Sequence, residues 1–144
     1  MQAYPHHYLS TATAQPQGLV RLESPGLTPI DSAPPAAFDG PGDQWSPETL
    51  LCAAIADCTI LTFRVVARMA KLEWRALSCE VHGTLERIEG RTSFTRFVTH
   101  ATLTVPEGTS EAAARAALEK SKGACLVSNS LSGSNTMEIT LVFA

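Results

Sequence analysis

Two cysteines and one glutamate are the residues in this chain whose types and spacing could support chemistry. Cys58 lies in the most apolar stretch, Leu50–Met69, ten residues after Glu48, and Cys125 lies near the end of a second helical pattern. Two thiols on separate elements that meet in space can form a reversible disulfide. The set therefore suggests redox chemistry.

Each of these residues also has a structural explanation. A thiol in an apolar helix usually behaves as a small, inert core residue. An acidic side chain in the first turn of a helix interacts favourably with the helix dipole, by roughly 0.3–1 kcal/mol. Cys52 and Cys79 fit a packing role best, because Cys52 is one of several small residues in its helix and Cys79 begins a strand. On residue chemistry alone, both readings stay open.

Several other kinds of site have no support in the sequence. No glycine-rich nucleotide-binding pattern and no Gly-x-Ser-x-Gly occurs, which argues against nucleotide binding and serine hydrolysis. No Cys-x-x-Cys occurs, and the histidines lack zinc-finger spacing to the cysteines. His82 and His100 alternate with apolar strand positions, as surface residues do. We therefore expect no metal and no cofactor.

The bulk composition predicts one globular domain over residues 1–144. The chain is 44% hydrophobic and 17% charged, with a formal net charge of −3. Its 11 lysines and arginines are scattered and are outnumbered by 14 acidic residues, so nucleic acid and anionic membrane are not expected as partners.

The first residues, Met1–Tyr8, lack the basic and apolar segments of a secretory signal, so we expect a cytoplasmic protein. In the cytoplasm most thiols are kept reduced, which favours free or catalytic cysteines over a structural disulfide framework.

The residues just before the apolar stretch are typical of the start of a helix. Ser46 is a good N-cap, Pro47 suits the first helical position and Glu48 suits the first turn, so we predict a helix from there to Ala70 or Lys71. Asp57 and Arg64 would be costly inside a membrane, which favours a buried helix. A helix that is apolar nearly all round needs cover on every side, and a second copy of the chain could supply it. This favours a homodimer.

The rest of the chain alternates between strand and helix patterns. Turn residues separate the segments, and alternate residues from Phe97 to Val105 share one face of their strand. The order predicts an α+β fold with a mostly antiparallel sheet. The predicted strands are Tyr8–Ala14, Leu19–Glu23, Leu27–Ile30, Ser78–Glu89, Thr92–Val105 and Thr136–Phe143, with a second helix at Glu111–Lys122.

Two runs of the sequence resemble a known family. Phe38–Cys58 contains Ser-Pro-Glu followed by an alanine-rich helix to a cysteine, and Ala124–Leu131 reads Ala-Cys-Leu-Val-Ser-Asn-Ser-Leu. Together they resemble the OsmC/Ohr family of osmotically inducible and organic hydroperoxide resistance proteins. Element order and length agree with that family over essentially the whole chain.

The resemblance implies an OsmC-like fold, with the sheet wrapped around a long central apolar helix in an intertwined homodimer. It also implies cysteine-dependent reduction of organic hydroperoxides. Carried over by position, Cys58 matches the peroxidatic cysteine, Cys125 the resolving cysteine and Glu48 the carboxylate at the start of the site helix. A dithiol reductant would then restore the two thiols.

The sequence departs from the family pattern in two places. The family's site arginine has no counterpart, because the corresponding positions read Gln15-Pro16-Gln17 and Ala36-Ala37. Arg21 is the nearest replacement. Cys125 is followed by Leu126 where the family has proline. These departures indicate a divergent branch, and an alternative function is a catalytically weak or inactive protein that binds a small hydrophobic ligand, acts as a thiol sensor or serves only as a scaffold.

Overall fold

The computed structural model describes all residues from 1 to 144. The chain divides into two compact units, Met1–Leu50 and Leu51–Ala144, and each is described by itself. Helix α1 (Pro47–Met69) begins in the first unit and continues into the second.

The first unit is built on a small antiparallel sheet of strands β1 (Thr11–Thr13), β2 (Val20–Glu23) and β3 (Ile30–Ser32), in that order. The predicted hairpin is confirmed, with shorter strands than expected. The third strand starts at Ile30, whereas the sequence predicts a strand that ends there, Leu27–Ile30. Prolines and glycines crowd the segments around it, and these residues shorten strands. A 3₁₀ turn, η1 (Ala36–Phe38), follows.

Helix α1 starts where the sequence predicts, and its first turn shows why. Ser46 Oγ accepts a hydrogen bond from the Thr49 backbone N–H at 3.1 Å, and Thr49 Oγ1 accepts one from the Ser46 N–H at 2.9 Å. These reciprocal bonds satisfy two amides at the helix start. The helix ends at Met69, just before Lys71, which has a φ of 52°.

The second unit contains a sheet of three long strands, β4 (Ala76–Ile88), β5 (Arg91–Val105) and β6 (Ser134–Phe143), in that order. The hairpin of β4 and β5 is antiparallel, and Glu89 and Gly90 form its turn with φ of 51° and 78°. Strand β6 instead runs parallel to β5. The sequence pattern did not predict this parallel pair, although the other three strand pairs are antiparallel, as expected.

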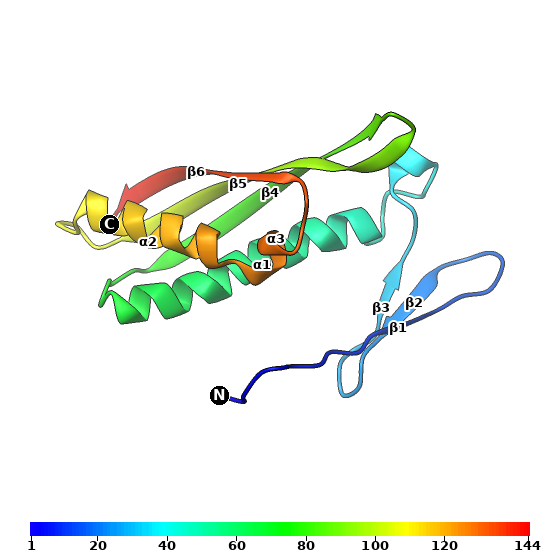
Figure 1. Cartoon of the computed structure of the whole chain (residues 1–144), viewed down its shortest axis with the longest axis horizontal. Coiled ribbons are helices and arrows are strands. Elements are labelled where there is room, and N and C mark those ends of the chain that lie inside the picture. The colour runs from blue at the N-terminus through cyan, green and yellow to red at the C-terminus, as the bar shows by residue number, and fades with distance from the viewer. The chain divides into compact units, whose positions relative to one another are not determined.

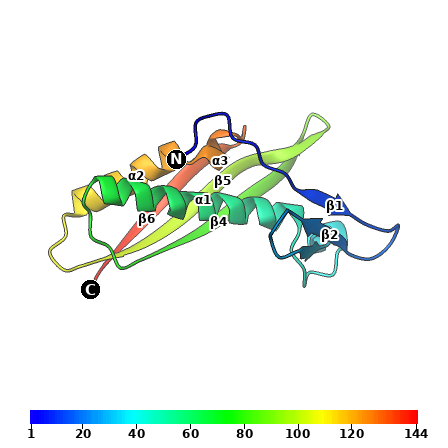
Figure 2. The same cartoon turned by 90° about the horizontal axis from the view of Figure 1, so that it is seen from below.

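The parallel pair follows from the crossover between β5 and β6, which carries helix α2 (Glu111–Ala124) and the short helix α3 (Leu126–Asn129). The predicted second helix is confirmed, and Ser110 caps it by accepting from the Ala113 N–H at 3.2 Å. The four-residue helix α3 was not predicted. In the second unit, α1 and α2 lie along the same face of the sheet (Figures 1 and 2).

The core of this unit lies between the two helices and the sheet. Alternate residues from Phe97 to Val105 on β5 are buried, as the pattern predicted. The buried cluster consists of Phe63, Val66, Ala67, Ala101, Leu103, Val105, Ala114, Ala117 and Leu118.

The outer side of α1 keeps apolar side chains in the open. Leu61, Val65 and Met69 are 49%, 45% and 70% exposed. By length and composition alone α1 could cross a membrane, a test that core helices of globular proteins also pass. Since Phe63 and Val66 on its other side are buried in the core, α1 packs as a core helix whose outer side lacks cover within one chain.

Candidate functional site

The structure brings together the two cysteines that the sequence singled out. Cys58 lies on α1 and is half-buried, whereas Cys125 lies between α2 and α3 and is fully buried. Their side chains are close enough for Cys58 to lower the pKa of Cys125. Cys58 Sγ also lies 4.0 Å from Thr62 Oγ1, one helical turn further on. Both thiols are free, so the structure is that of the reduced pair.

The surroundings of Cys125 favour its thiolate. Burial raises its pKa, but hydrogen bonds from the Ser128 hydroxyl and amide, and contacts with Cys58 and Thr59, outweigh that effect and leave the pKa of Cys125 below its usual value. The Ser128 Oγ to Cys125 Sγ distance is 3.3 Å.

Ser128 is the more effective of the two hydroxyl donors. Thr59 Oγ1 lies 3.8 Å from Cys125 Sγ but only 2.8 Å from the Ile55 carbonyl oxygen. A hydroxyl has a single proton to donate, and Thr59 donates it to the nearer acceptor, the Ile55 carbonyl oxygen. The proton that stabilises a thiolate at Cys125 therefore comes mainly from Ser128.

Glu48 occupies the first turn of α1, as predicted, and carries an unusual feature. Its Oε2 is buried and accepts no hydrogen bond. Glu48 also lines a cavity of about 490 Å³ in the first unit. A buried carboxylate oxygen without a donor costs free energy, so its position is informative about what the site can bind.

Arg21, the nearest replacement for the family arginine, is engaged elsewhere. Its Nε forms an ion pair with Glu23 Oε1 at 3.2 Å, and its side chain is 53% exposed. Within residues 51–144, the hydrogen-bonding partners of Cys58 and Cys125 are neutral side chains and a backbone amide. No guanidinium of that unit therefore hydrogen-bonds to either thiol.

The other two cysteines behave as packing residues. Burial, together with a smaller effect of the nearby Cys125, raises the pKa of Cys79 to about 11. Burial also raises the pKa of Cys52, partly offset by a hydrogen bond with the Gly83 backbone. A Cβ on Gly83 would lie 3.0 Å from Cys52 Sγ, which shows how closely α1 approaches β4 there.

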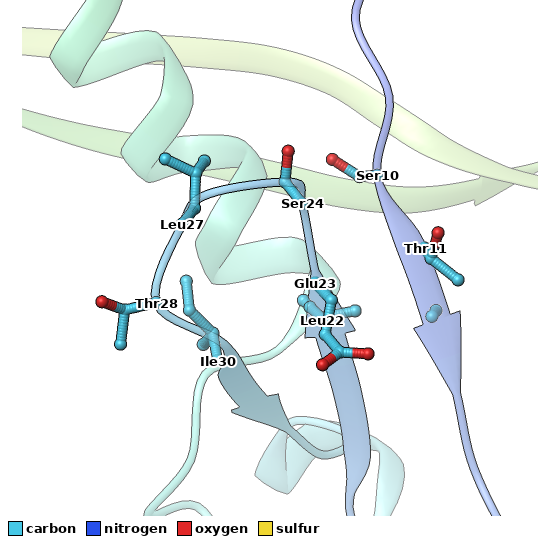
Figure 3. A pocket seen from close by; sticks show the side chains of 9 residues that line it. Ser10, Thr11, Leu22, Glu23, Ser24, Leu27, Thr28 and Ile30 are labelled. Carbon is cyan, nitrogen blue, oxygen red and sulfur yellow. The ribbon is translucent and has the colours of Figure 1, made fainter.

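A second, smaller cavity of the first unit lies beside the hairpin and holds no comparable group. Its volume is about 290 Å³, and Figure 3 shows the side chains that line it. Its one carboxylate belongs to Glu23, which is paired with Arg21. No group of three histidine, cysteine or acidic side chains in the chain is arranged to hold a metal ion.

Comparison with known proteins decides the family. Residues 40–140 match the family model described as OsmC-like protein. The chain belongs to the OsmC-like family. A Bacillus subtilis relative, the uncharacterized protein YmaD, is 23% identical over 108 residues, which are 73% of this chain and 72% of that protein.

Solved structures of OsmC-like proteins share the fold over nearly the whole chain. An OsmC-like protein of unknown function from Vibrio cholerae aligns with a TM-score of 0.85 at 17% identity, covering 94% of this chain and all of that one. An organic hydroperoxide resistance protein OsmC from Legionella pneumophila aligns with a TM-score of 0.76 at 23% identity, covering 97% and 99%. The α+β, OsmC-like fold expected from the sequence is thereby confirmed.

Sequence reasoning missed the hydroxyl partners of Cys125. Ser128 follows Cys125 by three residues and Thr59 follows Cys58 directly. The spacing of Ser128 was a usable signal, because a serine three residues after a helix-capping position reaches back to it. The contact of Thr59 depends on how α1 meets the α2–α3 junction, which no local pattern reveals.

Proposed function

We propose that this protein is a thiol-dependent peroxide reductase that acts on organic hydroperoxides, with Cys58 as the nucleophile and Cys125 as the resolving cysteine. The observation that carries the proposal is the proximity of the two thiols, which are distant in sequence, since Cys58 lowers the pKa of Cys125 and the residue after Cys58, Thr59, lies 3.8 Å from Cys125 Sγ. Cys58 is partly accessible to a substrate and Cys125 is buried, so the roles follow from access.

The proposed reaction begins with a proton transfer within the pair. The Cys125 thiolate takes the Cys58 proton as the Cys58 sulfur attacks the terminal peroxide oxygen. The O–O bond breaks, Cys58 becomes a sulfenic acid, and the alkoxide takes a proton from Cys125 and leaves as the alcohol. In this scheme the Cys125 thiolate activates Cys58 by taking its proton, whereas in the family an arginine supports the reactive thiolate.

The second half of the reaction resolves the sulfenic acid. The Cys125 thiolate, formed again in the first half, attacks the Cys58 sulfur, and the sulfenic oxygen leaves as hydroxide and is protonated to water. A dithiol then reduces the Cys58–Cys125 disulfide and is itself oxidised to a disulfide. We assign Glu48 the role of a site-orienting carboxylate.

Membership of the OsmC-like family supports this proposal, as does the fold shared with a protein named for organic hydroperoxide resistance. We further propose a homodimer, because Leu61 and Val65 leave an apolar strip open on α1. The cytoplasm, with its supply of dithiol reductants, is the proposed location. Neither nucleic acid nor membrane is a proposed partner.

A second candidate function is a catalytically weak or inactive protein that binds a small hydrophobic ligand or senses thiol oxidation. The specific observations in its favour are that no guanidinium of residues 51–144 hydrogen-bonds to either thiol and that the first unit contains an apolar cavity of about 490 Å³. Peroxide turnover separates the two functions.

The test is consumption of cumene hydroperoxide by the purified protein with dithiothreitol as reductant. We expect catalytic turnover by the native chain, none by Cys58→Ser, and turnover by Cys79→Ser close to that of the native chain. If the native chain turns over no faster than Cys58→Ser, the peroxidase proposal fails and the binding or sensing function remains.

A further inference from the structure

The hydroxyl of Thr62 differs from other hydroxyls on the helices. A threonine or serine inside a helix commonly donates to the carbonyl oxygen four residues earlier. Thr59 and Ser121 both do so, at 2.8 and 2.7 Å. The hydroxyl of Thr62 makes no such bond, and its one hydrogen-bonding neighbour in the chain is Cys58 Sγ at 4.0 Å. It therefore lies beside the sulfur and keeps its proton available.

The distance between the two side chains leaves room for a substrate oxygen. Cys58 and Thr62 are both half-buried, so a substrate can reach both of them. A reacting atom has to come within about 3–3.5 Å of the atom that attacks it. Because Thr62 Oγ1 lies 4.0 Å from Cys58 Sγ, an oxygen at that distance from the sulfur can also lie about 3 Å from the hydroxyl. The sulfur and the hydroxyl can thus contact the same hydroperoxide group.

The other two hydroxyls near the thiols are engaged elsewhere. Ser128 Oγ donates to Cys125 Sγ at 3.3 Å. Thr59 donates to the backbone of its own helix, and its side chain is buried. Of the three hydroxyls around the thiols, Thr62 is therefore the one that remains free to bind a substrate.

We propose that Thr62 is a further catalytic residue, whose hydroxyl donates a hydrogen bond to the leaving oxygen of the hydroperoxide. This inference rests on the proposed reductase function. As the Cys58 sulfur bonds to the terminal oxygen and the O–O bond breaks, the electron pair of that bond moves to the leaving oxygen. A donor placed where negative charge develops lowers the barrier. Thr62 keeps its own proton throughout, and the alkoxide takes its proton from Cys125.

Steady-state kinetics of Thr62→Val and Thr62→Ser with cumene hydroperoxide and dithiothreitol test this inference. Valine keeps the shape of the side chain and removes the hydroxyl, whereas serine keeps the hydroxyl. We expect kcat/KM to fall about tenfold in Thr62→Val, the effect of one hydrogen bond in a half-exposed site. Thr62→Ser should retain most of the native value.

Alkylation of Cys58 by iodoacetamide, followed by mass spectrometry, separates this role from an effect on the thiol or on the fold. The reaction uses the same sulfur but involves no peroxide oxygen, so its rate should be the same in the native chain and in Thr62→Val. A parallel fall in the alkylation rate would overturn the inference, because Thr62 would then act through Cys58 itself.

The kinetic result also distinguishes this inference from the proposed function. A native chain that turns over and a Thr62→Val variant that is equally active would overturn the role of Thr62 and leave the reductase function standing. Loss of activity in Thr62→Ser as large as in Thr62→Val would also overturn that role. A native chain without turnover would overturn both proposals.

Discussion

At the scale of single residues, this site is distinguished by the thiol that most readily ionises, which is the buried Cys125. Hydrogen bonds from Ser128 lower the pKa of the buried Cys125, whereas the hydroxyl nearest to Cys58 Sγ on its own helix, Thr62 Oγ1, lies 4.0 Å away. The structure therefore supports the ionisation of the buried thiol, Cys125. The reaction we propose depends on proton transfer between the two.

Ser128→Ala tests the role of that hydroxyl. Loss of the hydrogen bond raises the pKa of Cys125, so disulfide formation after a pulse of cumene hydroperoxide should slow about tenfold near neutral pH and recover at higher pH. Alkylation quenching at a series of pH values measures this. Ser130→Ala is the control, because Ser130 Oγ bonds to the Leu126 carbonyl at 2.8 Å and not to Cys125. An unchanged rate and pH profile for Ser128→Ala would refute the role.

The raised pKa of Cys79 predicts a loss of stability at alkaline pH. In the unfolded chain the pKa of this thiol is about 8.5, whereas in the folded protein its pKa is about 11. Between those values the unfolded chain holds fewer protons than the folded one, so the free energy of unfolding falls as pH rises.

Cys79→Ala removes this contribution. The variant should be less stable than the native chain at neutral pH because it loses packing, and the difference should shrink between about pH 8 and about pH 10. Urea unfolding at several pH values measures the difference. A gap that stays constant across this range would contradict the assignment.

At the scale of elements, local sequence patterns predicted helix starts and buried strand faces correctly. They did not predict how strands that are distant in the sequence pair with one another. The start of α1 and the face of β5 that is buried follow from capping residues and alternation, and both were predicted. The parallel pairing of β6 with β5 depends on the crossover through α2, which a local pattern does not encode. Helix α3 is a single turn after Cys125, too short to give a periodic signal.

Two glycines test how closely the elements constrain the backbone. A Cβ at Gly40 would lie 1.7 Å from the Pro34 carbonyl oxygen, whereas a Cβ at Gly123, within α2, would meet nothing within 4 Å. Gly40→Ala should lower the free energy of unfolding of its unit by more than about 2 kcal/mol, a cost typical of severe overpacking. Gly123→Ala should raise stability by about 0.5–1 kcal/mol. Chemical denaturation measures both, and similar effects of the two changes would contradict this description of the loop.

At the scale of the whole molecule, the sequence identified the family but not how the site is completed. The motifs around Cys58 and Cys125 were enough to predict the fold. The hydrogen-bond partners of Cys125 could not be predicted from the sequence, because they come from α1 and from the α2–α3 junction, which are distant in the chain. The unpaired oxygen of Glu48 likewise appears only in three dimensions.

The proposed homodimer makes a prediction at this scale. Leu61→Glu places a charge on the open apolar strip of α1, so the mass in sedimentation velocity should fall from that of two chains to that of one. Thr102→Glu is the control, since Thr102 is exposed on β5 and alternates with the buried Ala101 and Leu103. If both variants keep the mass of two chains, the α1 strip is not the interface. If the native chain is itself a monomer, the homodimer proposal fails.

The most direct test of the central claim is mass spectrometry of the protein after one equivalent of cumene hydroperoxide, with free thiols alkylated at once. The account predicts a Cys58–Cys125 disulfide in the native chain and a dimedone-reactive sulfenic acid at Cys58 in Cys125→Ser. Full alkylation of Cys58 in both proteins, with the peroxide unconsumed, would contradict it.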